Sequence, residues 1–204
     1  MAEKASLLVG AGSEGVNWAK DRPGIVTVDR DEGLIGESPP LHVVGDTMNL
    51  PFPDGSVPSI AADFLLNPVC IESPQLSEVS DSPERLLEPT VPPKVRSWYQ
   101  SLERPFDIQK GDLGTVRELC RETAVDEMWR VLQPAGTLVL LDRKHVNDWT
   151  IQQTSSLDPP PPLRDVQVMH ITEHDEKRSD SLRRIRTVDG MKGPVSKIRI
   201  RKPE

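Results

Sequence analysis

A short apolar segment that ends in a glycine-rich turn constrains the fold of this chain more than any other sequence feature. Leu7-Leu8-Val9 leads directly into Gly10-Ala11-Gly12-Ser13-Glu14-Gly15. An apolar run without polar alternation predicts a strand that is buried on both faces, as in a parallel sheet. Glycines at its end leave the backbone without side chains, so that a ligand can approach it closely. The turn is a candidate cofactor site, although glycine also ends many strands for steric reasons alone.

Two further β-rich runs end in a carboxylate. The run from Ile25 to Asp29 has the spacing after the glycines at which an acidic residue meets a ribose diol in a Rossmann-like unit. The run from Leu41 to Asp46 ends in Gly-Asp. We therefore expect three parallel strands whose polar ends meet at one edge of the sheet.

Four motifs in this order resemble the class I S-adenosylmethionine (SAM)-dependent methyltransferase family. The first two are the glycine turn and the acidic end at Asp29, and the third is Gly45-Asp46 followed by Leu50-Pro51-Phe52. The fourth runs from Arg130 through Val131, Leu132 and Pro134 to Gly136, ahead of a further apolar run that ends at Leu141. The resemblance covers residues 5–142. It implies an α/β, Rossmann-like three-layer fold, with a mostly parallel sheet and an antiparallel C-terminal edge.

The resemblance also implies a donor site and its cofactor. The backbone of Gly10, Ala11, Gly12 and Ser13 would face the methionine part of SAM, and Asp29 would face the ribose hydroxyls. Asp46 and Thr47 would face the adenine edge. The product would be S-adenosylhomocysteine (SAH). Methyl transfer depends mainly on proximity and alignment, so no catalytic triad is required.

Two residues are candidates for contact with the methyl acceptor. Asn67 ends the fourth predicted strand, residues 59–67, where amide- and amino-methylating members carry Asn-Pro-Pro-aromatic. Only Asn67 and Pro68 match that motif, and Asn-Pro is also an ordinary turn. His145 follows the fifth predicted strand and could act as a general base, because the pKa of histidine lies near neutrality. His145 could equally be a solvated surface histidine without a catalytic role. The histidines and the two cysteines, Cys70 and Cys120, lack metal-ligand spacing.

Some positions depart from the family pattern. Leu8 stands where many members have an acidic residue, Glu14 stands where a third loop glycine is common, and Pro58 replaces an acid before the fourth strand. The first helix, starting near Val16, is cut short by Pro23-Gly24, and residues 31–40 are too rich in glycine and proline for the usual second helix. A non-catalytic methyltransferase-like subunit that docks on an active partner is therefore an alternative to an enzyme. An NAD(P)-binding Rossmann protein would explain the glycine turn and Asp29, but not the later motifs.

The sequence predicts one domain over residues 1–204, with residues 5–142 as its motif-bearing core. Residues 68–112 form a Pro-rich insertion without a clear period, which is either a substrate lid or a poorly ordered segment. A helical period then runs from Thr115 to Leu132, a helix is expected over 146–153, and two late strands are expected near 166–171 and 195–200 within a basic segment, 163–204.

The composition limits the partners. The net charge is −7, although the stretch from Lys177 to Lys202 has ten Lys or Arg against Asp180 and Asp189. This basic stretch lacks aromatic residues for base stacking, so a small-molecule or partner-presented acceptor is favoured over nucleic acid. A mean hydropathy of −0.44 and the lack of a long apolar run predict a cytoplasmic protein without membrane contact.

Overall fold

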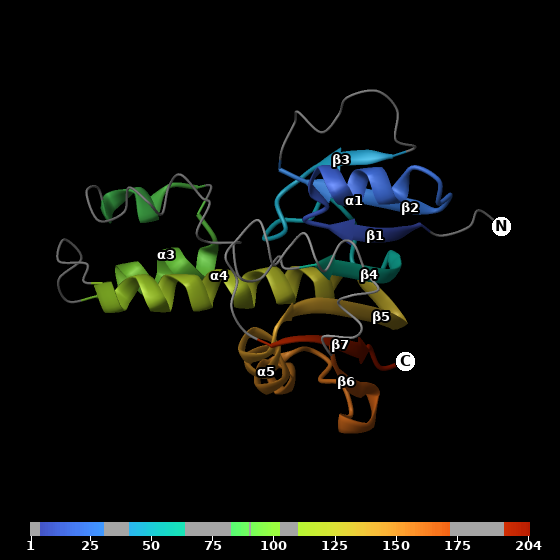
Figure 1. Ribbon diagram of the computed structural model, residues 1–204. Helices are drawn as coiled ribbons and strands as arrows, with labels where there is room; N and C mark the ends of the chain where they lie inside the picture. Colours follow the sequence, from blue (N-terminus) through green and yellow to red (C-terminus); the bar gives the residue numbers. More distant parts are fainter. Residues whose placement is uncertain (1–4, 31–40, 64–82, 90, 103–109, 172–193) are drawn as a thin grey trace.

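A seven-stranded mixed sheet forms the centre of the molecule (Figure 1). The computed structural model describes residues 5–30, 41–63, 83–89, 91–102, 110–171 and 194–204. The strand order is β3-β2-β1-β4-β5-β7-β6, with β7 and β6 antiparallel to their neighbours and the others parallel. The strands are β1 (Ser6–Val9), β2 (Ile25–Asp29), β3 (His42–Val44), β4 (Val57–Asp63), β5 (Leu132–Arg143), β6 (Val166–His170) and β7 (Val195–Arg201). The predicted parallel sheet with an antiparallel C-terminal edge is confirmed.

Helices cover both faces of this sheet. On one face, α4 (Lys110–Val131) and α5 (Lys144–Gln153) pack on a continuous core to which nearly all strands contribute. On the other face, α1 (Gly12–Ala19) covers β1 and β2, where Leu8, Val16 and Ala19 are buried outside that core. Alternate side chains of each buried strand therefore belong to different layers. The result is the three-layer α/β arrangement expected from the sequence.

The first helix is as short as the sequence predicts, with eight residues, although it begins at Gly12 rather than near Val16. Its early end has a steric cause, because Pro23 cannot continue a helix and Gly24 takes a φ of 84°. Residues 31–40, where the sequence predicts that the usual second helix is missing, lie outside the described residues.

The Pro-rich insertion contains regular structure that the sequence reading missed. A 3-10 helix, η2 (Pro83–Leu87), and the helix α3 (Pro93–Gln100) fall within it, and α4 begins at Lys110 rather than Thr115. Proline at the first helical position suits α3, because its missing N–H is not needed there. Val95 and Tyr99 are buried on the inner side of α3. This helix lies along the N-terminal half of α4, beyond the sheet (Figure 1).

Candidate functional site

The carboxyl ends of β1, β2 and β3 bring the predicted donor residues to one edge of the sheet. Val9 pairs with Val28, so Gly10 and Asp29 follow at the same level on adjacent strands. The Gly10 N–H donates to Val28 O at 2.8 Å, and the Gly45 N–H donates to Asp29 O at 2.9 Å. Asp29 is half-buried, so its carboxylate can still face a ligand at this edge. Ligands of open α/β sheets bind at this edge.

The glycine turn has the backbone shape that such a site needs. Gly10 takes a φ of 66°, a conformation that side chains disfavour. The helix α1 begins two residues later, and the N–H groups of a first helical turn have no acceptor within their own helix. A Cβ on Gly15 would lie 3.0 Å from Ala11 Cβ and 3.1 Å from Leu8 Cδ2. Gly15 thus supplies the close helix–strand packing that the third glycine of a Gly-x-Gly-x-x-Gly turn provides.

The Asp46 carboxylate is held at the end of the third strand segment. Its Oδ1 accepts the Met48 N–H at 2.9 Å, and its Oδ2 lies 3.2 Å from Arg30 Nη2. Thr47 is buried beside it. These contacts fix the Asp46 carboxylate just beyond the carboxyl end of β3, the strand that pairs with β2.

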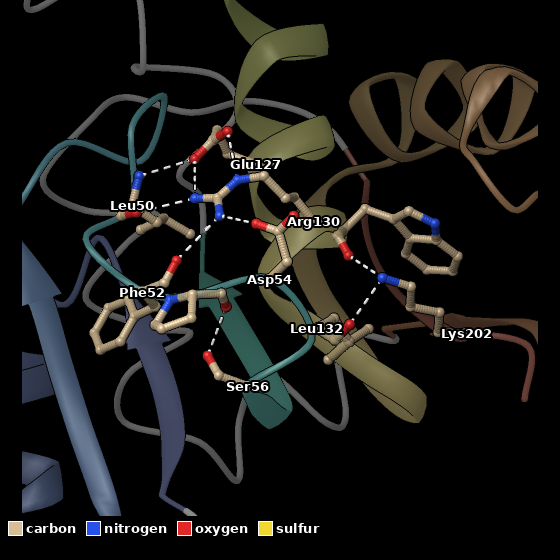
Figure 2. Close-up of polar contacts among 10 residues, drawn as sticks. Leu50, Phe52, Asp54, Ser56, Glu127, Arg130, Leu132 and Lys202 are labelled. Atoms are coloured by element: carbon tan, nitrogen blue, oxygen red, sulfur yellow. Dashed lines mark hydrogen bonds and ion pairs between the residues drawn. The ribbon is translucent and has the colours of Figure 1, made fainter.

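Arg130 fixes the loop that follows Asp46, a role that the sequence motif did not reveal (Figure 2). Its guanidinium donates to Leu50 O at 3.0 Å, to Phe52 O at 3.1 Å and to the Asp54 carboxylate. It also makes two parallel bonds to Glu127, at 2.9 and 2.8 Å, and Glu127 in turn accepts the Leu50 N–H at 3.1 Å. The two motifs that are separated by about 80 positions therefore form one unit, the Arg130 clamp.

The carboxylates of the Arg130 clamp stabilise the charged form of the Arg130 guanidinium. The hydrogen bonds that Arg130 donates to Glu127 raise its pKa above the ordinary value; burial opposes this with a smaller effect, and the bond to Asp54 adds to the rise. The neighbouring Lys202, near the end of β7, donates to Trp129 O at 2.6 Å and to Leu132 O at 2.8 Å (Figure 2). It thereby satisfies carbonyls at the C-terminus of α4.

His145 is exposed in the first turn of α5, directly after β5. Because β4 separates β1 from β5, the glycine turn and the end of β5 are about two strand spacings, roughly 10 Å, apart. Partial desolvation lowers the pKa of His145 below its ordinary value even at this exposed position, and the positive charges of Arg143 and Arg121 lower it further. A neutral imidazole at neutral pH has a nitrogen that can accept a proton.

Solved structures share this architecture, although sequence comparison finds no counterpart. No family model and no curated protein match the sequence. A 16S rRNA (adenine(1408)-N(1))-methyltransferase variant from Catenulisporales acidiphilia, solved with SAM, matches all of this chain and 87% of its own, with a TM-score of 0.51 and 12% identity. Phosphoethanolamine N-methyltransferase 2 from Haemonchus contortus, solved with SAH, matches with a TM-score of 0.50 and 9% identity. The chain has a methyltransferase fold. It spans half of the length of the Haemonchus protein.

The structure describes only some of the other residues that the sequence predicts for the site. Asn67, Cys70 and much of the 68–112 insertion lie outside the described residues, so the expected lid stays a prediction. Side chains of Gly12 to Glu14 are not described either. Cys120 is buried in the core, and the described residues contain no group of three or more metal-ligating side chains. Within the same residues, no helix is long and apolar enough to cross a membrane.

A cavity of about 530 Å³ lies away from the donor residues, near the amino ends of β4 and β5. It is lined by Asp54, Asp126, Trp129, Arg130 and Lys202, among others. The two cations are already engaged, Arg130 by its clamp and Lys202 by backbone carbonyls. Ligands of open α/β sheets bind beyond the carboxyl ends of the strands, whereas this cavity lies near the amino ends. We therefore do not assign the donor to it.

Proposed function

We propose that this chain transfers a methyl group from SAM to a small-molecule or partner-presented acceptor. One observation carries the proposal. The glycine turn, the Asp29 carboxylate and the Asp46 carboxylate lie on three adjacent parallel strands, at the edge where α/β sheets bind ligands. The antiparallel β7, inserted between β5 and β6, distinguishes this sheet from the fully parallel order typical of NAD(P)-binding domains and disfavours that alternative.

Each donor residue has a role that its position supports. Backbone groups of Gly10, Ala11, Gly12 and Ser13 bind the methionine part of the donor, and Asp29 accepts hydrogen bonds from the ribose hydroxyls. Asp46 and Thr47 bind the adenine edge. SAM itself supplies the electrophilic methyl group when it is bound. The chain's own contribution is to align the donor with the acceptor and to exclude water.

The acceptor is not fixed by the fold. The two solved neighbours carry names that refer to a phosphorylated amine and to an adenine of rRNA, which are chemically distant from each other. In our proposal His145 takes a proton from an oxygen or nitrogen acceptor, and Asn67 orients it. The 68–112 insertion closes over both ligands, so hydrogen exchange in this segment should slow when SAH binds.

Calorimetry with SAM and SAH tests the donor site directly. Asp29→Ala removes the acceptors for the ribose diol, and Gly12→Val places a branched side chain in the turn. Each change should weaken SAH binding at least about tenfold, or about 1.4 kcal/mol. Asp21→Ala is the matched control, because Asp21 is exposed beyond α1 and should leave the affinity unchanged. If both site variants bind SAH as tightly as the parent, the assignment is wrong.

A specific observation supports the second candidate, a non-catalytic methyltransferase-like subunit that docks on an active partner. Leu8 is buried against Gly15, so the first strand offers no carboxylate to a donor's amino group. Arg30 also occupies one oxygen of Asp46. If calorimetry shows no binding of SAM, SAH or NAD, a pull-down for an active methyltransferase partner becomes the deciding experiment.

A further inference from the structure

The strand β6 leaves one edge of the sheet open. It pairs with β7 along one side, and no strand of the described residues pairs with its other side. Its side chains are exposed from Gln167 to His170. Val168 is 43% exposed and Met169 is 45% exposed, and Leu163, just before the strand, is 87% exposed. The open edge therefore exposes two apolar side chains within the strand and a third just before it.

Open edges usually carry features that block pairing with another chain. Charged side chains, proline, bulges and a covering loop are the common ones. The sequence of β6 is Val-Gln-Val-Met-His, with no Lys, Arg, Asp, Glu or Pro. Its pairing with β7 runs in regular register, from Val166 opposite Ile200 to His170 opposite Ser196, without a bulge. This edge thus lacks the usual protection within the strand itself.

The backbone direction of each β6 residue follows from one hydrogen bond. The Ile171 N–H donates to Val195 O at 3.1 Å, so the backbone groups of Ile171 point toward β7. The direction of the backbone N–H and C=O groups alternates from one residue of a strand to the next, so the backbone groups of Met169 and Gln167 also point toward β7. The N–H and C=O groups of Val166, Val168 and His170 consequently point to the open edge. They form an evenly spaced set centred on Val168.

We propose that a second copy of this chain pairs with β6 in antiparallel orientation, on a two-fold axis at Val168. Val168 then faces its own symmetry mate, and Val166 faces His170 of the other copy. All three positions are of the hydrogen-bonded type, but the Val166 N–H already donates to Leu163 O, so about four backbone hydrogen bonds form. On the other face of the sheet Gln167 lies beside Met169 of the other copy. The two sheets become one continuous sheet across the axis.

Charge favours a second copy over a charged partner. The basic residues of the neighbouring strand, Lys197, Arg199 and Arg201, lie one strand further in, and none stands on β6 itself. Two copies carry −7 each, but the strands that meet are uncharged, so no like charges are brought face to face. An acidic peptide or a nucleic acid would instead need cations at the contact.

Sedimentation velocity of the whole chain, from about 1 to about 100 µM, tests the proposal. The parent chain should shift with concentration from the 22.7 kDa monomer toward twice that mass. Val168→Lys puts a charge at the axis. Val168→Pro fixes φ and removes an N–H that points away from β7, so no hydrogen bond to β7 is lost, and edge strands tolerate such a proline. Both variants should be folded by circular dichroism and should weaken dimerisation at least about tenfold.

Leu41→Lys is the matched control, because Leu41 is 59% exposed beside β3, at the opposite edge of the sheet. This variant should dimerise like the parent. A parent chain that stays monomeric at the highest concentration overturns the proposal. Dimerisation that persists in both Val168 variants overturns it as well, because the contact would then lie elsewhere. Neither outcome bears on donor binding, which calorimetry measures separately.

Discussion

Replacing Arg130 by Met should destabilise the protein far more than an ordinary surface ion pair would. The methionine keeps most of the apolar stem and removes the guanidinium, which bonds Glu127, Asp54 and the carbonyls of Leu50 and Phe52. The Arg130 side chain is only 33% exposed and that of Glu127 only 20%. The loss therefore falls between that of a surface pair and that of a buried one.

The magnitude follows from the bonds that would be lost. A hydrogen bond to a charged donor contributes about 1.5 to 3 kcal/mol when buried, and an exposed ion pair contributes about 0 to 1 kcal/mol. Two backbone carbonyls lose a charged donor, and the half-buried Glu127 loses its counter-ion. Discounted for the partial exposure of Arg130, the free energy of unfolding should fall by about 2 to 4 kcal/mol.

Urea unfolding followed by tryptophan fluorescence and circular dichroism measures this change. Lys94→Met is the matched control, because Lys94 also pairs with two carboxylates, Glu122 and Asp126, but is 43% exposed and bonds no backbone carbonyl in the described residues. It should cost less than about 1 kcal/mol. A double-mutant cycle of Arg130→Met with Glu127→Gln isolates the pairwise part.

The reasoning also predicts a functional difference. Because the clamp fixes the loop after Asp46, Arg130→Met should weaken SAH binding, whereas Lys94→Met should not. A loss of stability below about 0.5 kcal/mol for Arg130→Met, equal to that of Lys94→Met, would refute the idea that the clamp is structural.

Two further predictions concern glycine and histidine positions. Gly15→Ala should lower stability by about 1 to 3 kcal/mol, because its Cβ would stand 3.0 Å from Ala11 Cβ. Gly114→Ala should raise stability by about 0.5 to 1 kcal/mol, since a Cβ there meets nothing within 4 Å and the position lies inside α4, past its first turn. Thermal melts compare the two variants. NMR titration should find the pKa of His145 below 6.5, so that stability decreases as the pH falls through about 6.5, and Arg143→Gln should raise that pKa.

Local patterns in the sequence predicted the individual strands, whereas the antiparallel C-terminal edge of the sheet was predicted from the resemblance to a family. The strand β2 matches its predicted bounds because Ile25, Val26, Thr27 and Val28 form an unbroken β-branched run. The helix α4 was predicted from its apolar period, and the following strand β5 from the apolar run that ends at Leu141. That strand begins at Leu132, and its pairing with β4 is interrupted between Leu132 and Thr137, where Ala135 takes a φ of 58°.

Features that depend on contacts between distant residues were not predictable in this way. The proline count of the insertion concealed α3, although Val95 and Tyr99 stand four residues apart, as the buried side of a helix requires. Arg130 was identified by its motif alone, because its partners lie about 80 positions earlier in the chain. The open edge at β6 follows from strand order, which composition does not contain.

The position of β7 has a consequence for the order of events during synthesis. This strand comes last among the described strands, yet it lies between β5 and β6 and bonds to both. Until residues 195–201 leave the ribosome, β6 and the far side of β5 both lack the one described strand that pairs with them there. Completion of the sheet must wait for a long-range contact, which makes its closing step slow compared with helix formation. A nascent chain halted before β7 should therefore bind chaperones that recognise exposed apolar strands, whereas the released chain should not.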